Sequence, residues 1–173
     1  IGGMLRDAGF EVGAALPEKP SETAFRVVVA AQDYAQPTPN ACCHTLTPLR
    51  IGRTDFTHGV GAHANGRITL ALIQPFTVFK AKVGIDNNND TQGTRGSAVF
   101  IVEVDGVERY RSGVCRGGEE PVAVEVPLAG AKRIDLVLND AGDGIACDQA
   151  DWAEASLVTA DGGNVPLSQG FRV

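Results

Sequence analysis

Two glycine-containing segments of the sequence carry side chains that suit the recognition of sugar hydroxyl groups. The first, residues 57–66, contains His63 and Asn65, and the second, residues 84–97, contains Asp86 and Arg95. Both are expected to be loops on a rigid framework, where functional residues commonly lie. A sugar hydroxyl both donates and accepts hydrogen bonds, so imidazole, amide, carboxylate and guanidinium groups can all pair with it. These four residues are therefore predicted to bind carbohydrate.

A third polar segment, residues 139–152, ends on Asp151 and Trp152. Trp152 is the single tryptophan of the chain. The apolar face of a sugar ring packs well on an aromatic ring, so the sequence predicts that Trp152 is a sugar platform with Asp151 beside it. The alternative is that the tryptophan packs in the core, as aromatic residues commonly do.

Acidic residues in and after this third segment suggest calcium. Asp140, Asp143, Asp148 and Asp151 follow one another closely, and Glu154 comes next. Calcium takes six to eight oxygen ligands and often combines carboxylates with loop carbonyls. We predict Asp140, Asp143, Asp148 and Glu154 as ligands of a structural calcium ion. The spacing differs from that of an EF-hand, and a solvated loop with Asx turns is the alternative.

The sequence offers little support for catalysis or for a nucleic-acid partner. It has no G-x-S-x-G nucleophile elbow and no phosphate-binding or dinucleotide-binding fingerprint. A glycosidase needs two carboxyl groups that flank the scissile bond, and nothing in the sequence distinguishes such a pair. The formal charge of −6 and the pI near 5.0 disfavour binding to a polyanion.

The elements that must position these residues are predicted to be strands. Apolar residues alternate with polar ones in several segments, a period typical of half-buried antiparallel strands. Asp105-Gly106 between two such runs predicts a tight hairpin, and the 21 glycines fit many tight turns. A two-sheet antiparallel β-sandwich is predicted, with a barrel as the alternative. The expected strands are residues 25–31, 67–73, 77–85, 98–104, 122–128 and 134–138.

The length of 173 residues suits one domain, here residues 25–173. Residues 1–24 are rich in Gly and Pro and are expected to be an N-terminal arm or the tail of a preceding domain. The chain opens at Ile1 rather than at Met, as expected of a processed or excised piece. No apolar run approaches the ~20 residues that span a bilayer. If the protein is secreted, Cys42 or Cys43 is expected to pair with Cys115 or Cys147.

The stretch from about Leu49 to Val158 resembles the NPCBM family, which is grouped as family 51 of the carbohydrate-binding modules. Residues 56–64 (FTHGVGAHA) look like the family signature Gly-Leu-Gly-x-His-Ala, with Val60 in place of the usual Leu. The further matching pieces, in the order of the family, are residues 79–86, 97–106, 130–138, 140–144 and 148–155.

The resemblance implies a galactose-binding-like jelly roll, commonly with a structural calcium ion. It matches His63, Asp86, Asp151 and Trp152 to signature positions. It also implies a non-catalytic, extracellular or periplasmic module that directs an attached or partner glycoside hydrolase to glycans, with galactose-containing glycans among the expected ligands. The alternatives are a sandwich that docks a neighbouring domain or partner protein, and a hydrolase in its own right.

Overall fold

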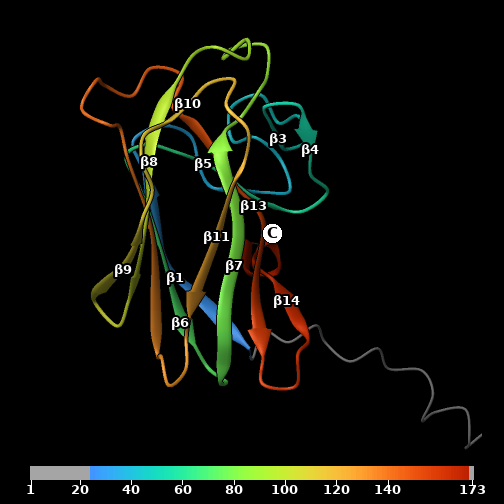
Figure 1. Ribbon diagram of the computed structural model, residues 1–173, viewed down its shortest axis with the longest axis vertical. Coiled ribbons are helices and arrows are strands. Elements are labelled where there is room, and N and C mark those ends of the chain that lie inside the picture. Colours follow the sequence, from blue (N-terminus) through green and yellow to red (C-terminus); the bar gives the residue numbers. More distant parts are fainter. Residues whose placement is uncertain (1–23, 172–173) are drawn as a thin grey trace, which may run out of the picture.

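The computed structural model describes residues 24–171, which form two packed antiparallel β-sheets and one short helix (Figure 1). Of the expected N-terminal arm, residues 1–24, only Ala24 lies within the described residues. The elements are β1 (Phe25–Gln32), β2 (Thr38–Pro39), β3 (Arg50–Ile51), β4 (Thr54–Asp55), β5 (Gly59–His63), β6 (Gly66–Leu72), β7 (Phe76–Ile85), β8 (Ser97–Val104), β9 (Val107–Arg111), β10 (Cys115–Arg116), β11 (Val122–Pro127), β12 (Arg133–Asn139), β13 (Gln149–Thr159), β14 (Asn164–Pro166) and the 3-10 helix η2 (Leu167–Phe171).

The first sheet has the strand order β1-β6-β12-β8-β10, and β9 pairs with β8. The second sheet has the order β11-β7-β13-β5-β2, and β14 pairs with β13. The strands β3 and β4 form a small separate ribbon. All of these pairings are antiparallel, so the predicted two-sheet sandwich is confirmed.

The alternating segments become strands close to their expected bounds. The Asp105-Gly106 turn joins β8 to β9, and both residues have positive φ, 48° and 81°. That backbone twist matches the twist of the flanking strands, which is why this dipeptide favours a tight hairpin.

Two segments that were expected to be functional loops contain long buried strands instead. The first holds β5, whose five residues are all buried, and the third runs into β13, which extends over 11 residues. Both strands are covered on two faces, so they lack the apolar–polar alternation by which a half-buried strand is detected. At Gly61 in β5, a side chain would collide with the backbone carbonyl of Ala41, so the covering loop requires glycine there.

The core between the sheets is centred on three aromatic rings. The rings of Trp152 and Phe100 meet edge to face at 5.1 Å, and Phe79 lies 6.2 Å from Trp152. All three residues have no exposed surface. Trp152 and Phe79 come from the second sheet and Phe100 comes from the first, so this cluster joins the two layers.

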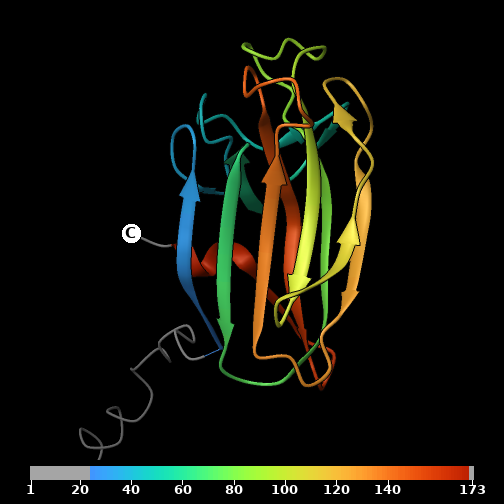
Figure 2. The same cartoon turned by 90° about the vertical axis from the view of Figure 1, so that its left-hand side faces the viewer.

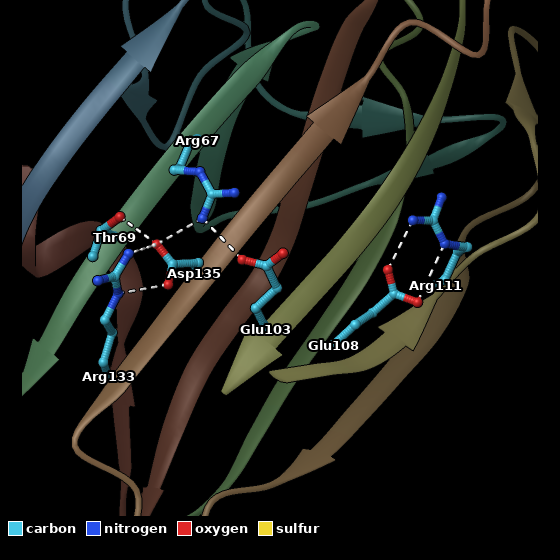
Figure 3. A network of polar contacts seen from close by, with 7 residues as sticks. All are labelled: Arg67, Thr69, Glu103, Glu108, Arg111, Arg133 and Asp135. Carbon is cyan, nitrogen blue, oxygen red and sulfur yellow. Dashed lines mark hydrogen bonds and ion pairs between the residues drawn. The ribbon is translucent and has the colours of Figure 1, made fainter. Parts of the chain in front are cut away.

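The outer face of the first sheet carries an ion network centred on Asp135 of β12 (Figure 3). Arg133 Nε lies 2.7 Å and Arg67 Nη1 3.1 Å from the carboxylate oxygens of Asp135, and Thr69 donates a further hydrogen bond. Arg67 also contacts Glu103 on β8 at 2.9 Å. The Asp135 side chain is fully buried beneath these partners, so the network ties β6, β12 and β8 together across their outer face.

Candidate functional site

Most of the predicted site residues gather at one end of the sandwich. Loops of residues 33–48, 86–96 and 140–148 meet there, beside the turn from β5 to β6 (Figures 1 and 2). The backbone nitrogen of Ala64 donates to the carbonyl of Asp148 at 3.2 Å, and Asp33 N donates to Asn65 O at 2.9 Å. These bonds hold segments that are distant in sequence against one another, and we call this region the loop end.

An exposed aromatic ring lies at the loop end over a buried histidine. The Tyr34 and His63 rings are 5.2 Å apart, and the Tyr34 and His44 rings are also 5.2 Å apart. The Tyr34 hydroxyl is hydrogen-bonded to His44 Nδ1 at 2.9 Å. Tyr34 is 46% exposed and His63 is 4% exposed, so Tyr34 offers the accessible aromatic face.

His63 is held by its own strand end. Its Nδ1 lies 2.6 Å from the carbonyl oxygen of Ala64, and its backbone nitrogen donates to Gln32 Oε1 at 3.2 Å. Burial lowers the pKa of His63, while the carbonyl of Ala64 acts in the opposite direction. The ring is therefore expected to be neutral at physiological pH, with one nitrogen able to donate and the other to accept.

Asn65 joins two carboxylates next to this aromatic group. Its Nδ2 donates to Asp33 Oδ2 at 3.1 Å and lies 3.4 Å from Asp140 Oδ2. Its Oδ1 accepts from the backbone nitrogen of Asp140 at 3.0 Å. Asp33 is exposed, and Asn65 and Asp140 are half-buried. Amide and carboxylate groups thus lie together at the surface, as recognition of hydroxyl groups requires.

A chain of amides connects the second loop to the strand opposite His63. Asn88 Nδ2 donates to Gln149 Oε1 at 2.7 Å and to Asp86 Oδ2 at 2.7 Å. Gln149 Nε2 in turn donates to Asp90 Oδ2 at 2.5 Å. Gln149 is the register partner of His63, so the chain places Asp90 at the loop end.

Asp86 and Asp151 lie in the interior and cannot touch a ligand in this structure, because neither has exposed surface. Asp86 accepts from the backbone nitrogen of Arg50 at 3.1 Å and so fastens the 86–96 loop. Burial, and then the neighbouring Asp86 side chain, raise the pKa of Asp151 well above its ordinary value. These two residues support the loop end from beneath.

Trp152 also lies away from any surface on which a sugar could stack. Its ring packs between Phe79 and Phe100 and has no exposed face. The predicted platform role fails because the Trp152 side chain points inward, into the core between the two sheets. The accessible aromatic at the loop end is Tyr34.

Arg95 is exposed in the second loop, and its backbone nitrogen donates to Thr91 O at 2.8 Å. Its guanidinium makes no hydrogen bond or ion pair with the residues that the structure describes. It lies near Cys147, whose pKa it lowers against a larger rise from burial. Arg95 therefore belongs to the loop end and lies near Cys147.

The four predicted calcium ligands do not come together. Glu154 lies on the outer face of the second sheet, 3.5 Å from Lys82 Nζ. Asp143 accepts from Ser97 Oγ at 2.8 and 2.9 Å, and Asp148 Oδ1 accepts from Ser97 N at 2.8 Å. Within residues 24–171, no group of three or more His, Cys, Asp or Glu side chains is placed to hold a metal ion. The residues as they lie do not fit the predicted site.

All four cysteines are free thiols, in contrast to the expected pairing. Cys43 Sγ lies 3.2 Å from the carbonyl oxygen of Ala62, and Cys42 Sγ lies 3.4 Å from Asn88 Nδ2. Cys115 lies instead beside Ser112, 3.9 Å from its hydroxyl. The thiols thus contact polar groups of separate segments.

Sequence reasoning missed the aromatic part of the loop end. Tyr34 and His44 lie in a segment with little periodicity, outside the three polar segments that were singled out. The available indication was the Gln32-Asp33-Tyr34 triplet at the end of a predicted strand, where functional loops commonly begin.

Comparison with known proteins is consistent with this architecture. The NPCBM/NEW2 domain family matches residues 20–158. The chain belongs to the NPCBM/NEW2 domain family. As a member, it is a carbohydrate-binding module and not a catalytic domain, as the sequence analysis predicted.

Solved relatives of this NPCBM module share its fold. The CBM51 module of a *Clostridium perfringens* GH95 protein, solved with methyl-galactose, is 28% identical with a TM-score of 0.70, over 77% of this chain and 94% of that chain. The *C. perfringens* ZmpB structure, comprising the M60 catalytic domain with two CBM51 domains, is 26% identical with a TM-score of 0.72, over 80% of this chain and 15% of that chain.

A curated relative is much longer than this NPCBM module. The Renibacterium salmoninarum protein named "Putative endo-alpha-N-acetylgalactosaminidase" is 37% identical over 111 residues, which cover 64% of this chain and 7% of that protein.

No helix within the described part of the chain is long and apolar enough to cross a membrane.

Proposed function

We propose that the loop end binds a galactose-containing glycan and that the module thereby holds an attached glycoside hydrolase at its substrate. The observation that carries this proposal is the convergence of Tyr34, His44 and His63 with the Asp33–Asn65–Asp140 group. An exposed aromatic face beside fixed amide and carboxylate groups provides both kinds of contact that a sugar ring needs.

Each residue has a distinct role in this proposal. The Tyr34 ring packs against the apolar face of the sugar. The imidazole of His44 and the Asn65 amide donate to and accept from hydroxyl groups, and Asp33 and Asp140 accept from them. His63 supports the Tyr34 ring from below. The buried residues Asp86, Asp151 and Trp152 act through the positions of these loops.

Relatives support the ligand and the attachment. The *C. perfringens* GH95 module, which this chain covers almost completely, was solved with methyl-galactose. The long relative from *R. salmoninarum* is named as a glycosidase, and the chain spans 7% of its length. An extracellular location follows from such a role, because large glycans lie outside the cell. A single sugar is expected to bind with a Kd near the millimolar range, and attachment then raises the effective concentration of the enzyme.

A glycan array with the 173-residue chain tests the proposal. We expect binding to galactose-containing glycans, loss of binding in Tyr34→Ala, and partial binding in Tyr34→Phe, which keeps the ring. Val28→Ala is the control, because Val28 is 60% exposed on β1, the strand that leads toward Tyr34. Retained binding in a folded Tyr34→Ala protein would place the glycan elsewhere.

Calcium stays a prediction from the family resemblance. Repeating the array in the presence of a chelator tests it separately. A loss of glycan binding or of thermal stability in chelator would show that a metal supports the module. Its ligands would then differ from the predicted set of four residues, which do not form one site.

A further inference from the structure

The loop end carries several carboxylates close to the proposed sugar site. Asp33 and Asp140 are both within hydrogen-bonding reach of the single Asn65 side-chain nitrogen, at 3.1 and 3.4 Å. Asp143 lies in the same loop as Asp140, and both raise the pKa of the neighbouring Asp148, after the larger effect of burial. Negative charge is therefore concentrated on the Asn65 side of the site.

Another carboxylate, Asp90, comes from the 86–96 loop and approaches His63 through Gln149. It is fixed by the Gln149 amide at 2.5 Å, and Gln149 is the register partner of His63. After burial and the Ala64 carbonyl, the neighbouring side chains that affect the pKa of His63 are His44, which lowers it, and Asp33 and Asp90, which raise it. The buried imidazole thus experiences carboxylates from two different loops.

Arg95 is a basic side chain at the loop end that could offset the charge of these carboxylates. It lies in the 86–96 loop, and its largest described effect is on Cys147, a half-buried thiol beyond Asp90. No arginine or lysine is among the groups with the largest effects on His63. The carboxylates that the hydrogen bonds hold at the loop end, Asp33, Asp90 and Asp140, therefore have no described basic partner there.

We propose that Asp33, Asp90 and Asp140 make the loop end prefer uncharged and amine-bearing galactosides over sulfated or carboxylated ones. This inference rests on the proposed function, because it concerns the same site. An anionic sugar substituent would have to approach carboxylates from several loops of the loop end, whereas a neutral hydroxyl can donate hydrogen bonds to them and an ammonium group is attracted to them.

The size of the effect follows from the partial exposure of the site. Charges several ångströms apart near a surface interact weakly one by one, but contributions from several carboxylates add. We expect a sulfated galactoside to bind roughly tenfold more weakly than the neutral sugar at low ionic strength, and about two- to threefold more weakly at ~0.5 M salt, where the Debye length is short.

Calorimetric titration with methyl-galactoside, galactosamine and galactose 6-sulfate, each at low and high salt, tests this inference. The expected order of affinity is galactosamine at least equal to methyl-galactoside, and both above galactose 6-sulfate. Equal affinity for all three, or a preference for the sulfated sugar through Arg95, would overturn the selectivity and leave the proposed function intact. Binding of none of the three would overturn both.

Matched variants separate charge from shape. Asp33→Asn and Asp140→Asn keep the side-chain size, and each is expected to reduce the neutral-to-sulfated affinity ratio by roughly two- to threefold. Asp161→Asn removes one charge at the β13–β14 hairpin, at the other end of the sandwich (Figure 1), and is expected to leave the ratio unchanged. A ratio that changes equally in all three variants, or in none, would contradict a local effect of these carboxylates.

Discussion

Asp151 and Asp86 both lie in the interior of the sandwich without exposed surface, and neither carboxylate oxygen of Asp151 has a hydrogen-bond partner among the described residues. Two ionised carboxylates can only accept hydrogen bonds, so their close contact is favourable when one of them carries a proton. Burial and this neighbour raise the pKa of Asp151 well above its ordinary value. Asp86 begins the 86–96 loop and Asp151 belongs to β13, and the backbone nitrogen of Asp86 donates to Gln149 O on β13 at 2.8 Å.

The free energy of unfolding should therefore decrease as pH rises. The folded protein retains a proton on Asp151, whereas the unfolded chain releases it above about pH 4, so the stabilisation is complete at low pH and is lost as pH rises through the folded pKa. Asp151→Asn carries a permanent donor and should remove the part of this dependence that Asp151 contributes, leaving the smaller part from Asp148, whose pKa burial raises to about 6. Thermal unfolding of both proteins between about pH 5 and pH 8.5 is the measurement. Stability profiles of the two proteins that stay parallel over this range would argue against a proton held on Asp151.

Asp135 should show the opposite pH dependence. Burial raises its pKa, but hydrogen bonds from Arg133, Thr69 and Arg67 outweigh burial and hold the pKa below its ordinary value. The stabilisation is therefore present near neutral pH and lost as pH falls. Asp135→Asn should lower stability by about 2 kcal/mol at neutral pH and converge toward the parent protein in acid. Urea unfolding at two pH values checks this, and glycan binding should be unchanged because the network lies on the outer sheet face (Figure 3).

The single tryptophan provides a spectroscopic test of the core assignment. Because Trp152 has no exposed surface, its fluorescence should resist quenching by acrylamide, and glycan binding should leave its emission nearly unchanged. Strong quenching that a bound sugar relieves would instead support the platform role predicted from the sequence.

Truncation of the same residue should destabilise the fold. Trp152→Ala removes contacts with Phe79 and Phe100 and is expected to cost about 3–5 kcal/mol, as large-to-small changes of buried aromatics do. Tyr34→Ala, at a ring that is 46% exposed, should change stability much less while it abolishes glycan binding. Denaturant unfolding of the two variants, side by side, distinguishes a core residue from a ligand contact.

The close backbone approach at Gly61 gives a further prediction. Gly61→Ala would bring a methyl group into the carbonyl of Ala41 and should displace the covering loop, with loss of thermal stability. Gly113→Ala is the matched control, because a methyl group there meets nothing within 4 Å. Equal melting temperatures for the two variants would show that the loop over β5 can shift to accommodate the methyl group without loss of stability.

Local pattern alone was sufficient for β1, β6, β7, β8, β11 and β12, whereas β9 and the short β10 of the first sheet were not among the expected strands. In β7 and β11 one face is more deeply buried than the other, which produces the alternation. The Asp105-Gly106 hairpin was equally predictable, since its backbone geometry depends on two adjacent residues. The ordered set of family motifs determined the family and the class of function from sequence.

Only the tertiary structure decided which polar residues reach the surface together. Four predicted site residues lie in signature segments but are covered by neighbouring loops and sheets: His63, Asp86, Asp151 and Trp152. Burial by segments that are distant in the chain cannot be predicted from the local sequence pattern. Tyr34 comes beside His63 for a similar reason: β1 and β5 end at the same end of the sandwich although some 30 residues separate them. Sequence thus determined the sandwich and its family, while long-range packing determined which side chains the glycan can touch.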